Sequence, residues 1–188
     1  MRIWMPYPET GGGADLYISR LARGLRALGH EVAVTRFAHL WQYFPWRLGL
    51  IRSPAGVDIA IGATGWAFPL RRHAQKLVVV EHHCVNDPVM AGFRNVLQAL
   101  YHEGLLRAFT RRSLRNAAAI VCVSDYTARS LTSIHPGTHP DVIRNGIETD
   151  FFCPAQQPES PSEGRPFRLL FVGNLIRRKG ALLELLVK

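Results

Sequence analysis

Short apolar runs and longer amphipathic segments alternate along the first half of the chain. An apolar run from Met1 to Tyr7 enters the glycine triplet Gly11-Gly12-Gly13. After the triplet, apolar residues recur at spacings of three and four, the period of one helix face, and Gly29 is placed to end that helix. Glu31 to Val34 predicts the next strand. This order of strand, glycine turn, helix and strand is typical of the opening βαβ unit of a doubly wound sheet.

The same alternation continues beyond residue 50. Two short apolar runs, Val57 to Ile61 and Leu77 to Val80, predict buried parallel strands. The spacing then predicts one long helix from about Phe93 to Arg115. Its expected inner face consists of Phe93, Val96, Leu97, Leu100, Leu105 and Ala108.

Two further strands and one helix complete the predicted domain. Ala119 to Val123 predicts a strand, and Ser124 is a suitable N-cap for a helix that runs through Leu131. Val142-Ile143 predicts a last, brief strand. The fold class expected from these elements is α/β, with a Rossmann-like doubly wound parallel sheet.

A change of composition indicates how the chain is divided. Residues 154 to 166 carry Pro, Ser, Glu and Gly with almost nothing apolar, which is typical of a linker. Arg168 to Val172 then predicts a new strand, followed by a turn at Gly173-Asn174 and a helix from about Gly180. We therefore predict an N-terminal Rossmann-like domain over residues 1–150, a linker over 151–166 and the incomplete start of a second domain over 167–188.

Charge narrows the choice of partners. The chain carries 23 Lys and Arg against 14 Asp and Glu, a net charge of +9 with a pI near 10.2. Such an excess suits nucleic acid, an acidic membrane surface or a phosphorylated small molecule. Because the Arg residues are spread over several predicted helices and no recognition motif is visible, no nucleic acid is expected.

Features of targeting and redox chemistry point to the cytoplasm. The N-terminus lacks the apolar core of a secretory signal, and no apolar run reaches the roughly 18 residues of a membrane-spanning helix. Cys84, Cys122 and Cys153 are widely spaced and lack metal-ligand spacing, so reduced thiols are expected.

The glycine triplet is the first candidate for binding chemistry. Glycines let a ligand approach the backbone, and the N-terminus of the following helix favours phosphate. The alternative is a plain tight turn. The pattern differs from G-x-G-x-x-G, and the second strand is followed by Thr35 and Arg36 rather than an acidic residue, so NAD binding is disfavoured.

A polar cluster, Glu81-His82-His83, follows the strand that ends at Val80. Ligands of open α/β sheets bind beyond the carboxyl ends of the strands, so this cluster is well placed. Adjacent residues of an extended segment point in opposite directions, so one histidine faces the cleft while the other packs or is solvated. A structural role for both stays open, and metal binding is disfavoured because no third ligand stands at a useful spacing.

Two basic segments have alternative interpretations. Lys179, with Arg177 and Arg178, precedes a predicted helix and is suited either to clamping a diphosphate or to a solvated charge run. The stretch from Phe37 to Arg52 interleaves aromatic residues with Arg, which suits a membrane interface or an aromatic flap over the core.

Four segments, in this order, resemble family-four retaining glycosyltransferases. They are GGGADLYISRLARGLRALGHEVAV, AAAIVCVSDYTARSL, VIRNGIETDFF and LLFVGNLIRRKG. The resemblance implies two facing Rossmann-like domains, the GT-B architecture, with an acceptor-side N-terminal domain followed by the start of a donor-binding domain. It also implies transfer of a sugar from a nucleotide-sugar donor.

The resemblance assigns roles in the N-terminal domain. It implies that Gly12 and Gly13 lie against the diphosphate of the donor. It implies that His82 is the cleft histidine near the reacting sugar, with His83 as the alternative if the alignment shifts by one residue.

The resemblance also assigns roles after the linker. Lys179 is the implied basic contact of the diphosphate. Asn174 stands where many members have Arg, and Arg178 is the residue that compensates. No metal or other cofactor is implied.

The expected function is hexosyl transfer from a nucleotide sugar to a glycan or lipid-linked acceptor. The expected location is the cytoplasm, with an anionic inner membrane surface as a further hypothesis. Because the family's Glu-x7-Glu segment is not among these 188 residues, the chain alone is expected to transfer no sugar. The alternative is a non-catalytic domain that binds a glycolipid or a partner protein.

Overall fold

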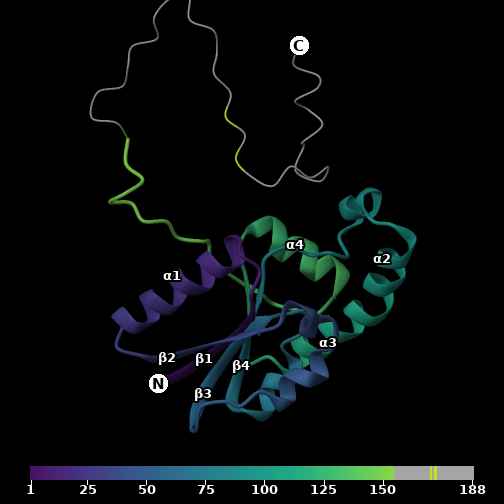
Figure 1. Ribbon diagram of the computed structural model, residues 1–188. Coiled ribbons are helices and arrows are strands. Elements are labelled where there is room, and N and C mark those ends of the chain that lie inside the picture. The colour runs from purple at the N-terminus through teal and green to yellow at the C-terminus, as the bar shows by residue number, and fades with distance from the viewer. Residues whose placement is uncertain (155–169, 171, 173–188) are drawn as a thin grey trace, which may run out of the picture. The chain divides into compact units, whose positions relative to one another are not determined.

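A computed structural model describes residues 1–154 together with Leu170 and Val172. Over these residues the strands form one parallel sheet of six strands in the order β2-β1-β3-β4-β5-β6 (Figure 1). The strands are β1 (Arg2–Pro8), β2 (Glu31–Phe37), β3 (Val57–Ala63), β4 (Ala74–Glu81), β5 (Ala119–Cys122) and β6 (Asp141–Val142). The predicted doubly wound parallel fold is confirmed.

Helices connect successive strands. They are α1 (Gly13–Ala27), α2 (Val96–Tyr101), α3 (Arg107–Asn116) and α4 (Asp125–Ile134). Short 3₁₀ turns lie at η1 (His39–Tyr43), η2 (Pro45–Leu50), η3 (Phe68–Arg72) and η4 (Pro88–Phe93), and a π-helical turn, η5 (His102–Leu106), joins α2 to α3. Two predicted helix ends are confirmed: Gly29 follows α1 with φ of 81°, and the Ser124 hydroxyl accepts a hydrogen bond from the Thr127 amide at 3.1 Å.

The strand order reverses direction at β1. From β1 the chain passes to β2 on one side of the sheet, and then returns to place β3 on the other side. In open α/β sheets the loops that leave such a reversal diverge and open a crevice at the carboxyl ends of the strands. The topology therefore predicts a ligand site near the loops after β1 and β3.

The core has two layers because β1 is buried on both faces. Ile3 and Met5 pack with Ala22 of α1 on one face. Trp4 points to the other face, where a larger cluster includes Leu70 and Leu77. The indole N–H of Trp4 donates to the Thr35 hydroxyl at 2.9 Å, so its one polar atom is satisfied.

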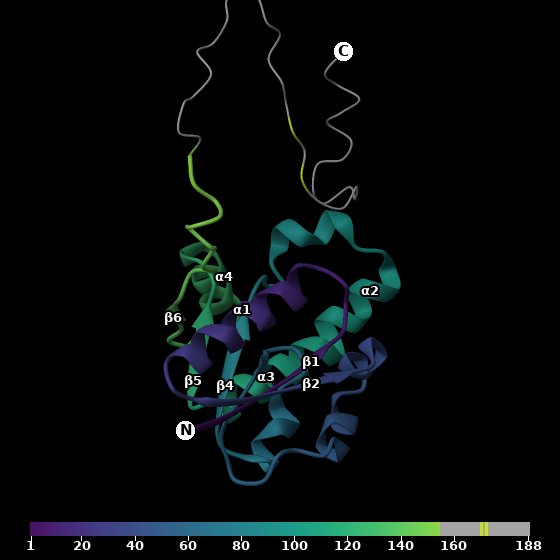
Figure 2. The same ribbon diagram turned by 60° about the vertical axis from the view of Figure 1, so that its left-hand side comes forward.

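The predicted inner face of the long helix is wrong. Val96, Leu97 and Leu100 are 79%, 77% and 69% exposed, Leu105 and Ala108 are also exposed, and Phe93 lies in η4 before the helix begins. The π-helical turn inserts a residue between α2 and α3 and so shifts the helical register. α3 packs on β4 and η3, whereas α2 makes no comparably extensive contact with a described strand (Figure 2).

The aromatic segment after β2 both covers the core and exposes rings. Pro45 and Leu48 of η2 are buried, and Trp41 packs against the larger core cluster. Phe44 and Trp46 are exposed. The interpretation as an aromatic flap over the core is therefore confirmed, and the membrane interface stays a prediction.

Residues 1–146 form one compact unit, and residues 147–188 form another. The predicted linker over 151–166 and the predicted second domain over 167–188 lie almost entirely outside the described residues, so these boundaries stay predictions. Within the described part of the chain, no helix is both long and apolar enough to cross a membrane.

Gly62 of β3 offers a test of how tightly this core is packed. A Cβ at Gly62 would lie 2.8 Å from Cζ3 of Trp66 and 2.9 Å from Cβ of Ala67. We expect Gly62→Ala to lower the free energy of unfolding by about 1–3 kcal/mol, measured by urea denaturation. The matched control is Gly24→Ala, an exposed position in α1 with no heavy atom within 4 Å of the added Cβ; it is expected to stabilise by up to about 1 kcal/mol. Equal stability of the two variants would contradict this account.

Candidate functional site

Loops that follow β1, β3 and β4 meet at the carboxyl edge of the sheet. They contribute the glycine turn before α1, Thr64 after β3, and the cluster Glu81-His82-His83 at the end of β4. This is the place at which the strand order reverses, so the sheet topology brings these segments together.

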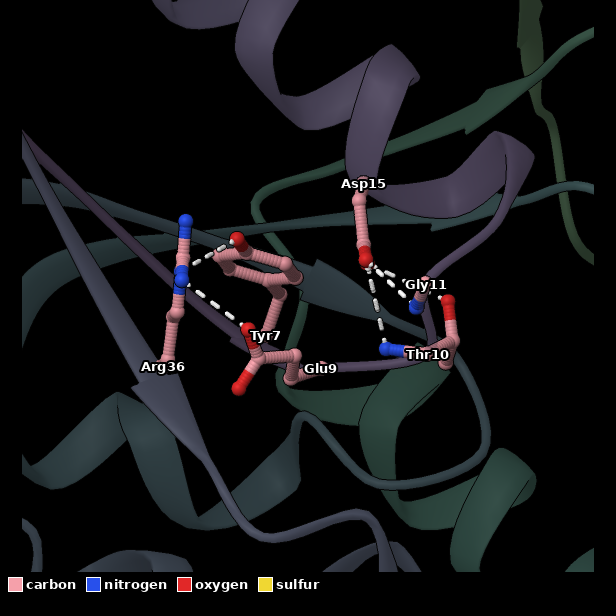
Figure 3. A network of polar contacts seen from close by, with 6 residues as sticks. All are labelled: Tyr7, Glu9, Thr10, Gly11, Asp15 and Arg36. Carbon is pink, nitrogen blue, oxygen red and sulfur yellow. Dashed lines mark hydrogen bonds and ion pairs between the residues drawn. The ribbon is translucent and has the colours of Figure 1, made fainter.

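The glycine turn is held in shape by Asp15 of α1. The Asp15 carboxylate accepts hydrogen bonds from the Gly11 amide at 2.7 Å and from the Thr10 hydroxyl at 3.1 Å (Figure 3). Burial acts to raise the pKa of Asp15, but the hydrogen bonds from Gly11 and Thr10 outweigh it, and the pKa is lowered. Gly11 has φ of 67°, which favours glycine.

Gly12 and Gly13 begin helix α1. Gly12 is its N-cap, with extended backbone, and Gly13 is its first residue. The first N–H groups of a helix lack intrahelical acceptors, and the helix dipole adds positive potential there. The Asp15 carboxylate accepts hydrogen bonds from the amides of Thr10 and Gly11, which precede the helix. It therefore shapes the turn without covering the N-terminus of α1.

Arg36 of β2 lies beside this turn. Its Nε donates to the Tyr7 hydroxyl at 3.0 Å, and its Nη1 donates to the Glu9 carboxylate at 2.9 Å (Figure 3). The contacts hold a guanidinium near the position where a dinucleotide-binding domain carries an acidic residue.

His82 packs against the first turns of α1. Its imidazole makes an edge-to-face contact with Tyr17, with ring centroids 4.5 Å apart. Burial lowers the pKa of His82, and the neighbouring His83 lowers it further, so the ring is neutral at pH 7. The structure thus brings His82 and the helix that starts at Gly13 together.

Behind this surface lies a cavity of about 270 Å³. His83 lines it, whereas His82 does not, which shows that the two histidines point to different surroundings. Polar side chains from loops and helices surround it: Thr64, Glu81, His83, Tyr101, His102 and His135.

Glu81 is a candidate that the sequence analysis did not single out. Its carboxylate accepts hydrogen bonds from the Thr64 hydroxyl and, at 3.3 Å, from the His83 amide. Burial raises the pKa of Glu81 to about 7, although these hydrogen bonds oppose the shift. The only signal in the sequence was an acidic residue at the end of an apolar run, and Thr64 lies 17 residues away.

His102 enters the cavity from the π-helical turn. Its Nδ1 is buried and has no hydrogen-bond partner in the structure. Burial lowers the pKa of His102, and the charge of Arg94 adds to this effect. Burial likewise lowers the pKa of His135, helped by Arg107 and Arg111. These imidazoles are neutral at pH 7, so they suit a ligand rich in hydroxyl groups.

Other predicted site residues lie outside this description. Asn174, Arg178 and Lys179 are not among the described residues. Within the described part, no group of three His, Cys, Asp or Glu side chains could hold a metal ion, and the absence of a metal requirement stays a prediction. Burial raises the pKa of Cys84 to about 12 and that of Cys122 to about 11, which makes both thiols poor nucleophiles.

The sequence profile of Glycosyltransferase Family 4 matches residues 35–151. The chain belongs to this family. The match covers the cavity and the Glu81-His82-His83 cluster, while the glycine turn lies before its first residue. A search of curated proteins returned no match.

The raised pKa of Glu81 predicts a dependence of stability on pH. The folded carboxyl binds its proton more tightly than the unfolded one, whose pKa is near 4.5, so the contribution of Glu81 to the free energy of unfolding falls as the pH rises from about 4.5 to about 7. The lowered pKa values of His82, His102 and His135 act in the opposite direction, because each imidazole binds its proton less tightly in the folded state. The loss from Glu81 is of the order of 3 kcal/mol. Across that range, the free energy of unfolding of the wild type minus that of Glu81→Gln, measured by urea denaturation, is therefore expected to fall by this amount.

The control for this experiment is Glu31→Gln, because Glu31 is exposed and lies at the opposite edge of the sheet. It is expected to keep the wild-type slope. Identical slopes in the wild type and in Glu81→Gln would show that the carboxyl is not desolvated as described.

Proposed function

We propose that this chain forms the acceptor-side part of a hexosyltransferase that uses a nucleotide-sugar donor and a glycan or lipid-linked acceptor. The observation that carries the proposal is the cavity lined by hydrogen-bonding side chains next to the Glu81-His82-His83 cluster. It lies beyond the carboxyl ends of β3 and β4, and α/β sheets bind ligands beyond the carboxyl ends of their strands. Membership in the family supports sugar transfer in general.

On the donor side, Gly12 and Gly13 lie against the diphosphate. Small residues allow close approach, and the first amides of α1 donate to phosphate oxygens. Lys179, with Arg178 and Asn174, completes the diphosphate contact in this proposal. Fixed amides and cations stabilise the leaving diphosphate, so the proposed reaction uses no metal.

At the reacting sugar, His82 supplies a neutral imidazole. A neutral imidazole both donates and accepts hydrogen bonds, whereas a protonated one only donates. The neutral ring therefore suits a sugar hydroxyl better. On the acceptor side, Thr64, Glu81 and His102 offer hydroxyl, carboxyl and imidazole groups to a polyhydroxyl ligand. A lipid-linked acceptor would bring the protein to the cytoplasmic surface of a membrane.

Titration of the ¹⁵N-labelled chain tests this division of the site. Uridine, guanosine and adenosine diphosphates are added separately, and the amide resonances of Gly12 and Gly13 are followed by NMR. At least one nucleotide is expected to shift both resonances at millimolar concentration, while Gly24 of α1 stays unchanged.

The acceptor side is tested with methyl pyranosides in the same samples. They are expected to shift the imidazole resonances of His83 and His102. Shifts with pyranosides but none with any nucleotide would favour a non-catalytic domain that binds a glycolipid. No shift with either class would contradict the proposal.

Substitution of His82 distinguishes a contact with the sugar of the donor from a contact with its nucleotide. His82→Ala is expected to weaken binding of the cognate nucleotide sugar about tenfold, the value of one buried hydrogen bond, and to leave binding of the free nucleoside diphosphate unchanged. Isothermal titration calorimetry measures both affinities. An equal loss for the two ligands would place His82 against the diphosphate instead.

A further inference from the structure

Helix α2 and the turn before it expose a continuous set of apolar side chains. We call this set the α2 ridge; it consists of Val89, Phe93, Val96, Leu97, Leu100 and Leu105. Each is at least 45% exposed; Val96, Leu97 and Leu100 lie on α2, Val89 and Phe93 on η4, and Leu105 on η5. Tyr101 of α2 and His102 of η5 line the cavity instead. A set of large apolar side chains exposed along one connection indicates an interaction surface.

Exposed aromatic residues continue the ridge beyond α2. We call Tyr43, Phe44, Trp46 and Leu50 the aromatic corner; all four are exposed. The ring of Tyr43 lies 5.7 Å from that of Tyr101, and the ring of Trp46 lies 6.3 Å from that of Phe109. These contacts place the corner beside the helix that follows from the ridge, on the same side of the domain (Figure 2).

The charge of this region selects its partner. Residues 37–52 and 88–116 contain a single acidic residue, Glu103. They contain seven arginines, of which Arg94 is largely buried and pairs with Glu103, as does Arg107. The exposed positive charge gathers at the aromatic corner, where Trp46 shares a surface hollow with Arg71, Arg72 and Arg112. A second copy of the chain would bring the same positive charge to the contact, whereas an anionic surface complements it.

The types of side chain match an interfacial position in a bilayer. Trp and Tyr favour the headgroup region, where Arg contacts lipid phosphates and Leu reaches the acyl chains. Arg47 stacks over Trp41 at 5.2 Å and Arg112 over Phe68 at 4.9 Å, so these cations already lie on aromatic rings.

We propose that the α2 ridge and the aromatic corner dock on an anionic lipid surface. Docking there leaves the cavity, which Tyr101 and His102 line, one helix diameter, roughly 10 Å, from the headgroups. An acceptor held in the membrane then reaches the cavity without leaving the bilayer. The docking does not depend on His82 or on donor binding.

Flotation with vesicles tests the proposal on the full 188-residue chain. Wild-type protein is expected to float with vesicles that contain about 30% phosphatidylglycerol and to stay behind with pure phosphatidylcholine. Leu97→Asn/Leu100→Asn is expected to reduce the bound fraction at least about tenfold. Raising the salt to about 0.5 M is expected to weaken binding of the wild type.

A matched pair of single variants is Leu97→Asn, which is expected to bind vesicles less well than the wild type, and its control Leu28→Asn. The two leucines are similarly exposed, at 73% and 77%, but Leu28 lies at the end of α1. Leu28→Asn is expected to float like the wild type. Thermal unfolding of each variant confirms that the fold is kept.

Tryptophan fluorescence gives an independent readout. Trp4 and Trp66 are buried, whereas Trp46 is exposed, so a blue shift on adding anionic vesicles reports chiefly on the aromatic corner. Trp46→Phe is expected to remove most of the shift. His82→Ala is expected to bind vesicles like the wild type, which separates failure of docking from failure of the proposed transfer.

Two outcomes would overturn the proposal. One is equal flotation of the wild type and Leu97→Asn/Leu100→Asn with anionic vesicles. The other is a dimer of the wild type in sedimentation velocity that the double variant abolishes, together with no flotation. The second result would assign the ridge to contact between copies.

Discussion

Burial of β1 on both faces and along both edges is the constraint on which the site depends. β1 pairs with β2 over residues 2–8 and with β3 at Ile3 and Trp4. Its alternate side chains fill two different core layers, so the strand has no freedom to shift by one residue. The turn that follows it is therefore fixed relative to the ends of β3 and β4, and Asp15 then sets the path from that turn into α1.

The site combines ionisable groups whose charged forms burial disfavours. Burial keeps a proton on Glu81 up to about pH 7 and keeps the nearby imidazoles neutral. The arginines of the domain act on these groups through space, as at His102 and His135, without lining the cavity. The result is a cavity without a lining arginine or lysine inside a strongly basic protein.

The long connection between β4 and β5 contains a π-helical turn, and it contributes both to the cavity and to the exposed face of α2. The π-helical turn shifts the register between its two helices. α3 buries Ser113 and Leu114, whereas the leucines of α2 are exposed and His102 of the π-helical turn lines the cavity. Asp87 anchors the start of this connection by accepting hydrogen bonds from Tyr126 and Ser130 of α4.

The sequence by itself determined the order of the elements, the ends of α1 and α4, and membership in the family. The order and the ends of the elements depend on neighbours within a few residues: the period of apolar positions, a serine N-cap, a glycine with positive φ. Membership in the family depends on the pattern over residues 35–151. Only the tertiary structure decided which face of α2 is covered, which histidine lines the cavity, and that Glu81 meets Thr64. Periodicity shows which residues share a face but not whether another element covers it, and a pKa follows from surroundings that distant segments supply.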